Sequence, residues 1–261
     1  MTKDKNTPLL SIVIPAYNEE QRLGKTLSET FDYLAAQDYS SEIIVVDDGS
    51  RDQTVEIANS FQSQANEKTK LYVLKNPGNR GKGYAVRNGM LHAIGEIHLF
   101  FDADLATPLD QIPKVIQPIL KGEYDVVFGS RALDEAVIQV EQSFLRQLRG
   151  RGGNLLIQIL TGMKIKDTQC GFKAFRRQAS QTVFPLQQIE GFGFDPEILF
   201  IANKRGWRWK EVPVVWRHVE GSKVTMFSAT ISVLTEVFKI RWNDLMGKYD
   251  SRKVTEEVGL Q

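Results

Sequence analysis

The sequence predicts an α/β protein with a mostly parallel central sheet covered by helices on both faces. Short β-branched runs alternate with helical patterns through the first half of the chain, an order typical of parallel sheets. The 261 residues are 42% hydrophobic and 25% charged, which suffices for one large domain with a buried core. We expect strands at 9–14, 42–46, 71–74, 96–101 and 125–128, and helices at 19–36, 52–62, 83–94 and 109–120.

The second half of the chain is less regular. Residues 144–163 have helical spacing with glycines in the middle, and residues 171–175 and 209–215 have strand character. Residues 227–241 have the spacing of an amphipathic helix. We expect a single domain over residues 1–245 and a flexible tail over 246–261.

Composition excludes several classes of function. A net charge of +1 argues against a general nucleic-acid binder. The single cysteine, Cys170, excludes an internal disulfide framework and favours a reducing compartment. The first eight residues carry no signal-peptide core, and no run of 18 apolar residues predicts a transmembrane helix. We therefore expect any membrane to be met from its surface.

Polar and acidic residues follow three of the predicted strands, at 14–20, 46–50 and 101–104. Because parallel strands end at the same edge of a sheet, these segments should line one rim. Asp102 and Asp104 are the most informative pair, since two carboxylates in this spacing can share Mg²⁺ or Mn²⁺ beside a phosphate group. The alternative is a solvated turn.

Two further segments have equally plausible local roles. Asp48 or Ser50 could cap the next helix, while Asp47 accepts a hydrogen bond from a nucleobase. The glycine-rich segment 79–83 could cradle a phosphate before a helix, although it lacks P-loop spacing, or could be a flexible basic turn.

Together these segments resemble the inverting family 2 nucleotide-sugar glycosyltransferases over roughly residues 9–245. The likeness extends to their dolichyl- or polyprenyl-phosphate subgroup, and most of all to the dolichyl-phosphate β-glucosyltransferases. It rests on Asp102-Ala103-Asp104, Gly129-Ser130-Arg131, the run 167–173 (D-T-Q-C-G-F-K), Phe194-Asp195-x-Glu197 and Glu220-Gly221-Ser222-Lys223.

The resemblance implies a GT-A fold, with a Rossmann-like sheet flanked by helices and a C-terminal amphipathic helical segment. It divides the domain into a donor-nucleotide half, 9–130, and an acceptor half, 131–245. It also implies an enzyme that transfers one hexose, with UDP-glucose favoured as donor, to a polyprenyl or dolichyl phosphate. Mg²⁺ or Mn²⁺ would be the cofactor, and the protein would sit peripherally on the cytoplasmic face of a membrane.

Site residues are carried over by motif. Nucleotide-sugar contacts are expected from Pro15, Tyr17, Glu19, Asp47, Asp102, Ala103, Asp104, Arg131, Arg217 and Lys223. Metal ligands are expected at Asp102 and Asp104, and acceptor-phosphate contacts at Arg149, Arg151 and Lys173. Catalytic roles fall to Asp195, Arg131 and Lys223. Asp195 would lie beside the reacting sugar, or alternatively cap a helix that Pro196 begins. Asp167 and Glu197 would contact sugar hydroxyls or orient Lys173 and the arginines.

Two departures from the sequence motifs of related glycosyltransferases narrow the activity that we expect. Mannose-transferring relatives often carry Gln where this chain has Ala106, which favours the glucosyl subgroup. Processive synthases carry Q-x-x-R-W, whereas residues 238–242 read F-K-I-R-W, so we do not expect polymerisation.

Two segments are candidates for lipid contact. One is the basic cluster 146–153, which leads into the apolar run 155–160. The other is a helical face formed by Phe227, Ile231, Leu234 and Phe238, followed by Lys239, Arg241 and Trp242. The alternative for both is packing against the sheet.

Four other functions compete with the first. A GDP-mannose-dependent mannosyltransferase would use the same site, and a non-catalytic nucleotide-sugar-binding module would keep the fold without turnover. A sugar-nucleotide pyrophosphorylase would need a basic glycine-rich loop after the first strand, which the segment 15–19 does not resemble. A protein or soluble-glycan acceptor is disfavoured by the run 167–173.

Overall fold

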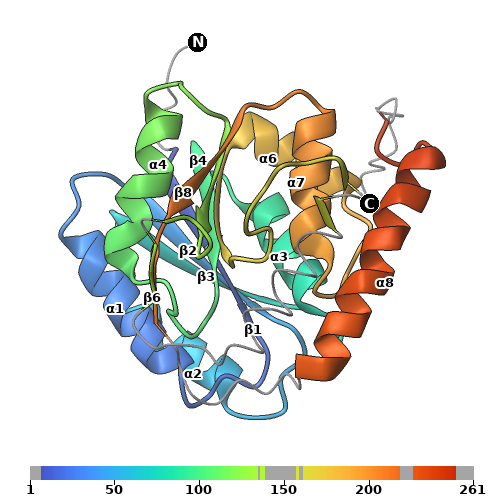
Figure 1. Cartoon of the computed structure of the whole chain (residues 1–261). Helices are drawn as coiled ribbons and strands as arrows, with labels where there is room; N and C mark the ends of the chain where they lie inside the picture. The colour runs from blue at the N-terminus through green and yellow to red at the C-terminus, as the bar shows by residue number, and fades with distance from the viewer. Residues whose placement is uncertain (1–6, 135, 139–156, 159–160, 218–225, 251–261) are drawn as a thin grey trace, which may run out of the picture.

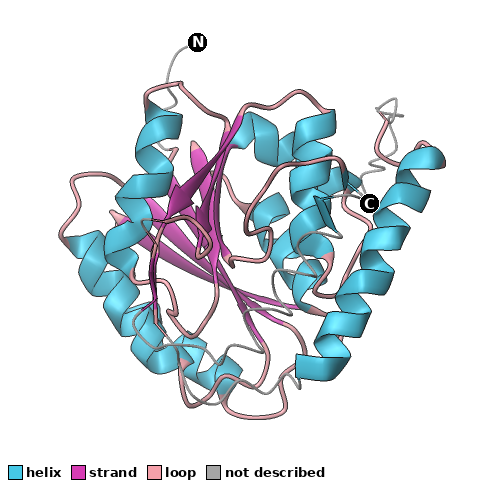
Figure 2. Ribbon diagram, in the orientation of Figure 1, coloured by secondary structure: helices cyan, strands magenta, loops and turns pink. Residues whose placement is uncertain are grey.

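The computed structural model describes residues 7–134, 136–138, 157–158, 161–217 and 226–250. A seven-stranded sheet of order β3-β2-β1-β4-β7-β5-β8 forms the centre of the molecule, with helices on both sides (Figures 1 and 2). Only β7 runs antiparallel to its neighbours, so the expected mostly parallel sheet is confirmed. Its strands are β1 (Leu10–Ala16), β2 (Ser41–Asp47), β3 (Thr69–Lys75), β4 (Ile97–Phe101), β5 (Val126–Ser130), β7 (Phe172–Arg176) and β8 (Trp209–Pro213).

Helices divide between the two faces of the sheet. One set of helices packs against one face of the sheet and a second set packs against the opposite face, giving two separate apolar cores. The first set comprises α1 (Leu23–Ala35), α2 (Thr54–Ser60) and α4 (Ile112–Leu120). The second comprises α3 (Lys82–His92), α6 (Arg177–Val183) and α7 (Phe194–Lys204), with α8 (Met226–Leu245) packed outside α7. Short 3₁₀ turns occupy Phe61–Gln64, Leu109–Gln111 and Phe184–Leu186.

The central strands are buried on both faces, which explains their continuous apolar runs. Their register brings the carboxyl ends together. Ala16 of β1 lies opposite Asp47 of β2, and Val13 of β1 lies opposite Phe100 of β4. The segments that follow β1, β2 and β4 therefore share one rim, as expected from the sequence.

The second half holds the differences from expectation. Residues 209–215 divide into β8 and β9 (Val215–Trp216), and β9 pairs with the short strand β6 (Val137–Ile138). The expected helix 144–163 and the basic cluster 146–153 lie almost entirely outside the described residues. Of the expected tail, residues 246–250 are described, and Tyr249 is fully buried rather than loose.

Candidate active site

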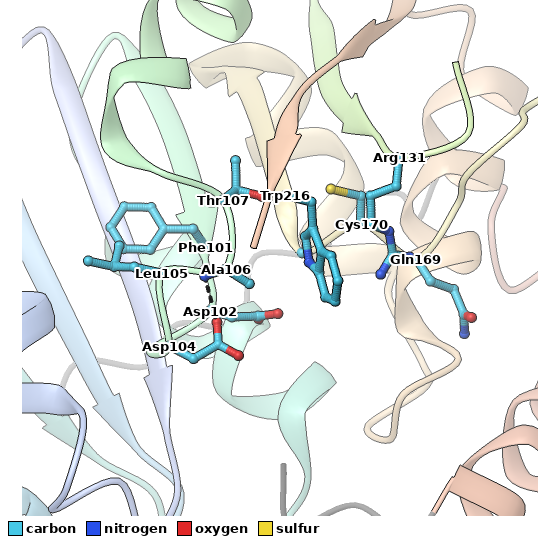
Figure 3. A pocket seen from close by; sticks show the side chains of 11 residues that line it. Phe101, Asp102, Asp104, Leu105, Ala106, Thr107, Arg131, Gln169, Cys170 and Trp216 are labelled. Carbon is cyan, nitrogen blue, oxygen red and sulfur yellow. Dashed lines mark hydrogen bonds between the residues drawn. The ribbon is translucent and has the colours of Figure 1, made fainter. Parts of the chain in front are cut away.

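A pocket opens at the carboxyl edge of the sheet, around the end of β4 (Figure 3). Its floor is the turn that carries Asp102 and Asp104. The Thr26 hydroxyl, from α1, donates to the carbonyl of Ala103 at 2.6 Å and holds this turn in place. Leu105 has a φ of 50°, and the Ala106 amide donates to Asp104 Oδ1 at 3.0 Å. The turn is thus a shaped loop whose two carboxylates share one pocket, not a solvated turn.

The positive charge near Asp102 and Asp104 does not balance the negative charge of their two carboxylates. Burial, and then the neighbouring Asp102 carboxylate, raise the pKa of Asp104. One cation already lies there: the Lys82 ammonium is 2.6 Å from Asp102 Oδ1. Burial acts to lower the pKa of Lys82, but the charges of Asp102 and Asp195 outweigh it and raise that pKa. Two hard oxygen donors with uncompensated charge fit Mg²⁺ or Mn²⁺, and the remaining ligands would come from a diphosphate and water.

Gly171, in the run 167–173, permits the Asp102 carboxylate to lie where it does. A Cβ at Gly171 would be 2.7 Å from Asp102 Cγ and 2.8 Å from Oδ1, and closer still to Oδ2. No larger residue fits there unless the carboxylate moves. The glycine of this run is therefore required by close approach to the acidic pair.

Arg131 is held rigidly at the pocket by the first residue of the same run. Its guanidinium donates to both carboxylate oxygens of Asp167, at 2.7 and 2.9 Å, and its backbone amide donates at 3.0 Å. Burial acts to raise the pKa of Asp167, but the Arg131 charge holds it below its usual range. Arg131 also lies over the Trp216 ring, at 5.8 Å from its centroid. Figure 3 shows Arg131 and the acidic pair on opposite sides of Trp216, so one wall of the pocket carries two carboxylates and the other an arginine whose charge Asp167 balances.

Lys173 lies deeper than the expected phosphate contact would. Its side chain has no exposed surface, and its ammonium donates to the Cys170 carbonyl at 2.6 Å and to the Asp195 carboxylate. This burial argues against direct contact with an acceptor phosphate. Lys173 instead fixes the Cys170–Gly171 turn beneath Asp102.

Asp195 is neither the expected helix cap nor exposed to substrate. The helix α7 begins at Phe194 with Gly193 as its N-cap, so Asp195 lies within the first turn. Its side chain is 4% exposed and pairs with Lys173. Burial raises its pKa, against the opposing charges of Lys173 and Lys82. The geometry supports positioning through these two lysines rather than contact with the reacting sugar.

Glu197 has a structural role instead of a sugar contact. The backbone amides of Gln188 and Ile189 and the Tyr249 hydroxyl all donate to its buried carboxylate, at 3.1, 2.9 and 2.6 Å. Burial raises the pKa of Glu197 to about 7. These bonds attach two segments to α7: the turn before it, at Gln188 and Ile189, and the turn after α8, at Tyr249.

The rim beside β1 and β2 contains the residues expected to hold a nucleoside. Asp47 ends β2, and its carboxylate accepts the Ser50 amide at 3.1 Å. Pro15 lies within β1, and Tyr17, which follows it, is 38% exposed. Glu19 forms a two-bond ion pair with Arg22, each bond 2.7 Å long.

Neither Asp48 nor Ser50 caps the next helix. The α2 N-cap is Gln53. The Asp48 carboxylate instead accepts the Asn76 side-chain amide and the backbone amides of Arg80 and Gly81 at 2.7–3.1 Å. It thereby fixes the segment 76–81 that leads to Lys82, so this segment is an ordered loop and not a flexible turn.

Some expected residues cannot be placed. Lys223, Arg149 and Arg151 lie outside the described residues. The Arg217 amide donates to the Ala106 carbonyl at 2.7 Å, so Arg217 lies beside the acidic turn.

Sequence reasoning missed the roles of Trp216, which lines the pocket, and of the Lys82 side chain, which pairs with Asp102. Lys82 lies in the segment 79–83, whose lysine-glycine pattern was a signal of phosphate chemistry. Trp216 carried no sequence signal, because its place in the pocket depends on the pairing of β9 with β6.

Comparison with known proteins gives one consistent result. The family model for glycosyl transferase family 2 matches residues 11–184. Dolichyl-phosphate β-glucosyltransferase of Saccharomyces cerevisiae is 37% identical, over 96% of this chain and 79% of its own. The Homo sapiens enzyme of the same name is 35% identical, over 94% and 79%, and the Dictyostelium discoideum enzyme is 37% identical, over 91% and 75%.

Solved structures agree at the level of fold. Glucosyl-3-phosphoglycerate synthase from Mycobacterium tuberculosis, in complex with Mn²⁺, UDP-glucose and glycerol 3-phosphate, superposes with a TM-score of 0.65 at 21% identity. The match covers 90% of this chain and 80% of that one. This likeness shows the GT-A fold and confirms the fold class expected from the sequence.

Proposed function

The chain belongs to glycosyl transferase family 2, and we propose that it transfers one glucose from UDP-glucose to the phosphate of a dolichyl or other polyprenyl phosphate. Relatives bearing the dolichyl-phosphate β-glucosyltransferase name are 35–39% identical over most of the chain. The structural observation that carries the proposal is the pocket itself, where an acidic pair faces an arginine held by Asp167.

Asp102 and Asp104 would hold a divalent cation, Mg²⁺ or Mn²⁺. That ion, when bound, supplies positive charge to the departing diphosphate. The protein's part is to keep the two carboxylates fixed, which Thr26, Gly171 and Lys82 do from three different elements. The neighbouring rim, with Asp47 and Tyr17, would bind the nucleoside.

The acceptor needs no general base. The second pKa of a phosphate monoester is near ~6, so a lipid phosphate already carries a nucleophilic oxygen at neutral pH. The described pocket agrees with this, because Asp195 is buried and paired with Lys173. Arg131, with its guanidinium fixed by Asp167, would orient an incoming phosphate for in-line attack at the anomeric carbon. Attack from that side inverts an α-linked donor into a β-linked product.

The proposed acceptor is a lipid, so the protein must work at a membrane surface. Among the described residues, no helix is long and apolar enough to cross a bilayer. We propose peripheral attachment at the cytoplasmic face, where a nucleotide-sugar donor and a reducing environment for the free Cys170 are both available.

The test is direct. The purified protein is incubated with a short-chain polyprenyl phosphate, Mg²⁺ or Mn²⁺, and either UDP-glucose or GDP-mannose, and the lipid is weighed by mass spectrometry. We expect a hexosyl lipid phosphate from UDP-glucose that disappears with EDTA and in Asp104→Ala. Product from GDP-mannose alone would overturn the donor assignment. Nucleotide binding without product from either donor would favour a non-catalytic module.

A further inference from the structure

The last turns of α8 and the residue after it carry an exposed apolar stripe, formed by Phe238, Trp242, Leu245 and Met246. These four residues are 56%, 64%, 76% and 61% exposed, in that order. The spacing of four, seven and eight residues from Phe238 places all four on one side of the helix. A stripe of this size on one helix side marks a contact surface rather than scattered exposure.

The opposite side of α8 packs against α7. Val237 and Ile240 are fully buried in the core that α7 shares. The Asp244 carboxylate accepts the Lys204 ammonium at 2.5 Å, and Tyr249 is bonded to Glu197. These contacts fix the rotation of the helix, so the stripe cannot turn inward. In Figure 1, α8 lies at the outer edge of the molecule, with α7 on its inner side.

Charge beside the stripe indicates the partner. Lys239, Arg241 and Lys248 are exposed on the same part of α8 and the turn after it. Two acidic residues lie nearby: Asp244 pairs with Lys204 and with Arg241, which is 3.2 Å away, and Asp250 pairs with Lys204 at 2.7 Å. Lys204 and Arg241 balance these two acids, so Lys239 and Lys248 supply the excess positive charge. A tryptophan among aliphatic side chains with cations alongside is the composition of a helix that lies in the interface of an anionic bilayer.

We infer that this stripe docks the protein on an anionic lipid surface, with α8 lying flat in the interface. The inference rests on the proposed function only for its purpose, which is to bring the pocket to a lipid-linked acceptor. The surface overlaps the one expected from the sequence in Phe238 and Trp242, adds Leu245 and Met246, and leaves out Phe227, Ile231 and Leu234, whose side chains lie outside the described residues.

Contacts also connect α8 to the pocket. The Glu236 carboxylate accepts the Gly193 amide at 2.6 Å. The adjoining Glu190 pairs with Arg80 at 2.5 Å, and its carbonyl accepts the Tyr84 amide. Arg80 and Tyr84 flank Lys82, which lies against Asp102. A docked α8 would therefore hold the pocket at a fixed orientation to the membrane.

A second copy of the chain is the competing occupant of the stripe. Two stripes meeting face to face would bring Lys239 and Lys248 of both copies together. This like-charge contact disfavours the dimer and favours an anionic surface.

Vesicle sedimentation tests the inference. The purified full chain is mixed with vesicles of phosphatidylcholine, or of equimolar phosphatidylcholine and phosphatidylserine, in the absence of any acceptor. We expect binding to the anionic vesicles and much less to the neutral ones. The double variant Trp242→Ser/Leu245→Ser should lose at least about tenfold in partitioning, because each exposed side chain contributes about tenfold when buried in lipid.

The control is Leu91→Ser/Ile94→Ser, which removes two exposed apolar side chains on and just after α3, outside the stripe. It should bind as the unaltered protein does. Equal binding by the α8 double variant, or no binding by the unaltered protein, would overturn the inference. A dimer seen by light scattering that the α8 variant abolishes would assign the stripe to a second copy instead.

Activity assays separate this inference from the proposed function. The α8 double variant should keep its kcat/KM on a water-soluble short-chain polyprenyl phosphate and lose it on the same headgroup embedded in anionic vesicles. An unaltered protein that binds vesicles but glucosylates neither acceptor would overturn the proposed function while the docking surface stands. A protein that glucosylates the soluble acceptor but does not bind vesicles would overturn the docking surface while the proposed function stands.

Discussion

Gly171→Ala is the sharpest test of how the acidic pair is positioned. The added Cβ would lie 2.7 Å from Asp102 Cγ, against 3.4 Å for an ordinary contact. The Asp102 carboxylate must therefore retreat by about 0.7 Å, and by more at Oδ2, or the turn must shift. A displacement of about 1 Å costs roughly a hundredfold in rate, or about 2.7 kcal/mol of transition-state stabilisation. We expect kcat to fall by that factor, and the affinity for Mn²⁺ to fall with it.

The fold should tolerate this change, because the displaced atoms belong to a side chain and not to the backbone. Unfolding in urea should show a loss below about 2 kcal/mol. Gly24→Ala is the matched control: its Cβ would meet Ile57 Cγ2 at 3.6 Å, an ordinary contact. Gly24 lies in the first turn of α1, so the change should stabilise the protein by less than about 1 kcal/mol and leave activity unchanged. A folded Gly171→Ala protein whose kcat and Mn²⁺ affinity stay within about twofold of the original would refute this account of the motif.

Three other predictions concern separate contacts. Asp167→Asn removes the charge that fixes Arg131, so kcat/KM should fall about tenfold or more in steady-state assays, whereas exposed Asp110→Asn should have no effect. Burial lowers the pKa of His98 to about 4, so the unfolded chain alone takes up this proton as the pH falls from 6.5 to 4. The contribution of His98 to stability should therefore fall by about 2 kcal/mol between pH 7 and 5. Because the raised pKa of Glu197 acts in the opposite direction over this range, the measured quantity is the difference between the urea curves of the original protein and of His98→Gln, and this difference should change by that amount. Tyr249→Phe removes the hydroxyl bonded to Glu197 and should cost about 1–3 kcal/mol by thermal unfolding; a loss no larger than that of exposed Tyr72→Phe would contradict the bond's importance.

The sequence predicts the first half of the fold well because each of its strands is a short apolar run between turn residues. The expected strand 42–46 is β2 (Ser41–Asp47), and the expected helix 83–94 is α3 (Lys82–His92). Such elements are specified locally, by burial on both faces or by helical periodicity. The rim at their carboxyl ends then follows from the parallel order.

Contacts between distant residues could not be predicted in the same way. The strands β6 and β9 are two residues each, and their pairing depends on tertiary placement, not on propensity. The alternative that Asp195 caps a helix was wrong: the helix begins at Phe194, and the Asp195 carboxylate pairs instead with Lys173, 22 positions away. Tyr249 has the sequence context of a tail, yet its ring and hydroxyl are buried against α7.

Charge balance in the pocket joins these separate observations. Asp102, Asp104 and Asp195 face two ammonium groups, those of Lys82 and Lys173, while Arg131 is neutralised by Asp167. Three carboxylates against two ammonium groups leave an excess negative charge in a partly buried space. After burial, carboxylate repulsion from Asp102 contributes to the raised pKa of both Asp104 and Asp195. A divalent cation would reverse the sign of this excess, and the pocket would then attract a diphosphate instead of repelling it. The lysines therefore bring the acidic pair close to neutrality without achieving it, and the charge that remains is the one that a bound divalent cation would compensate.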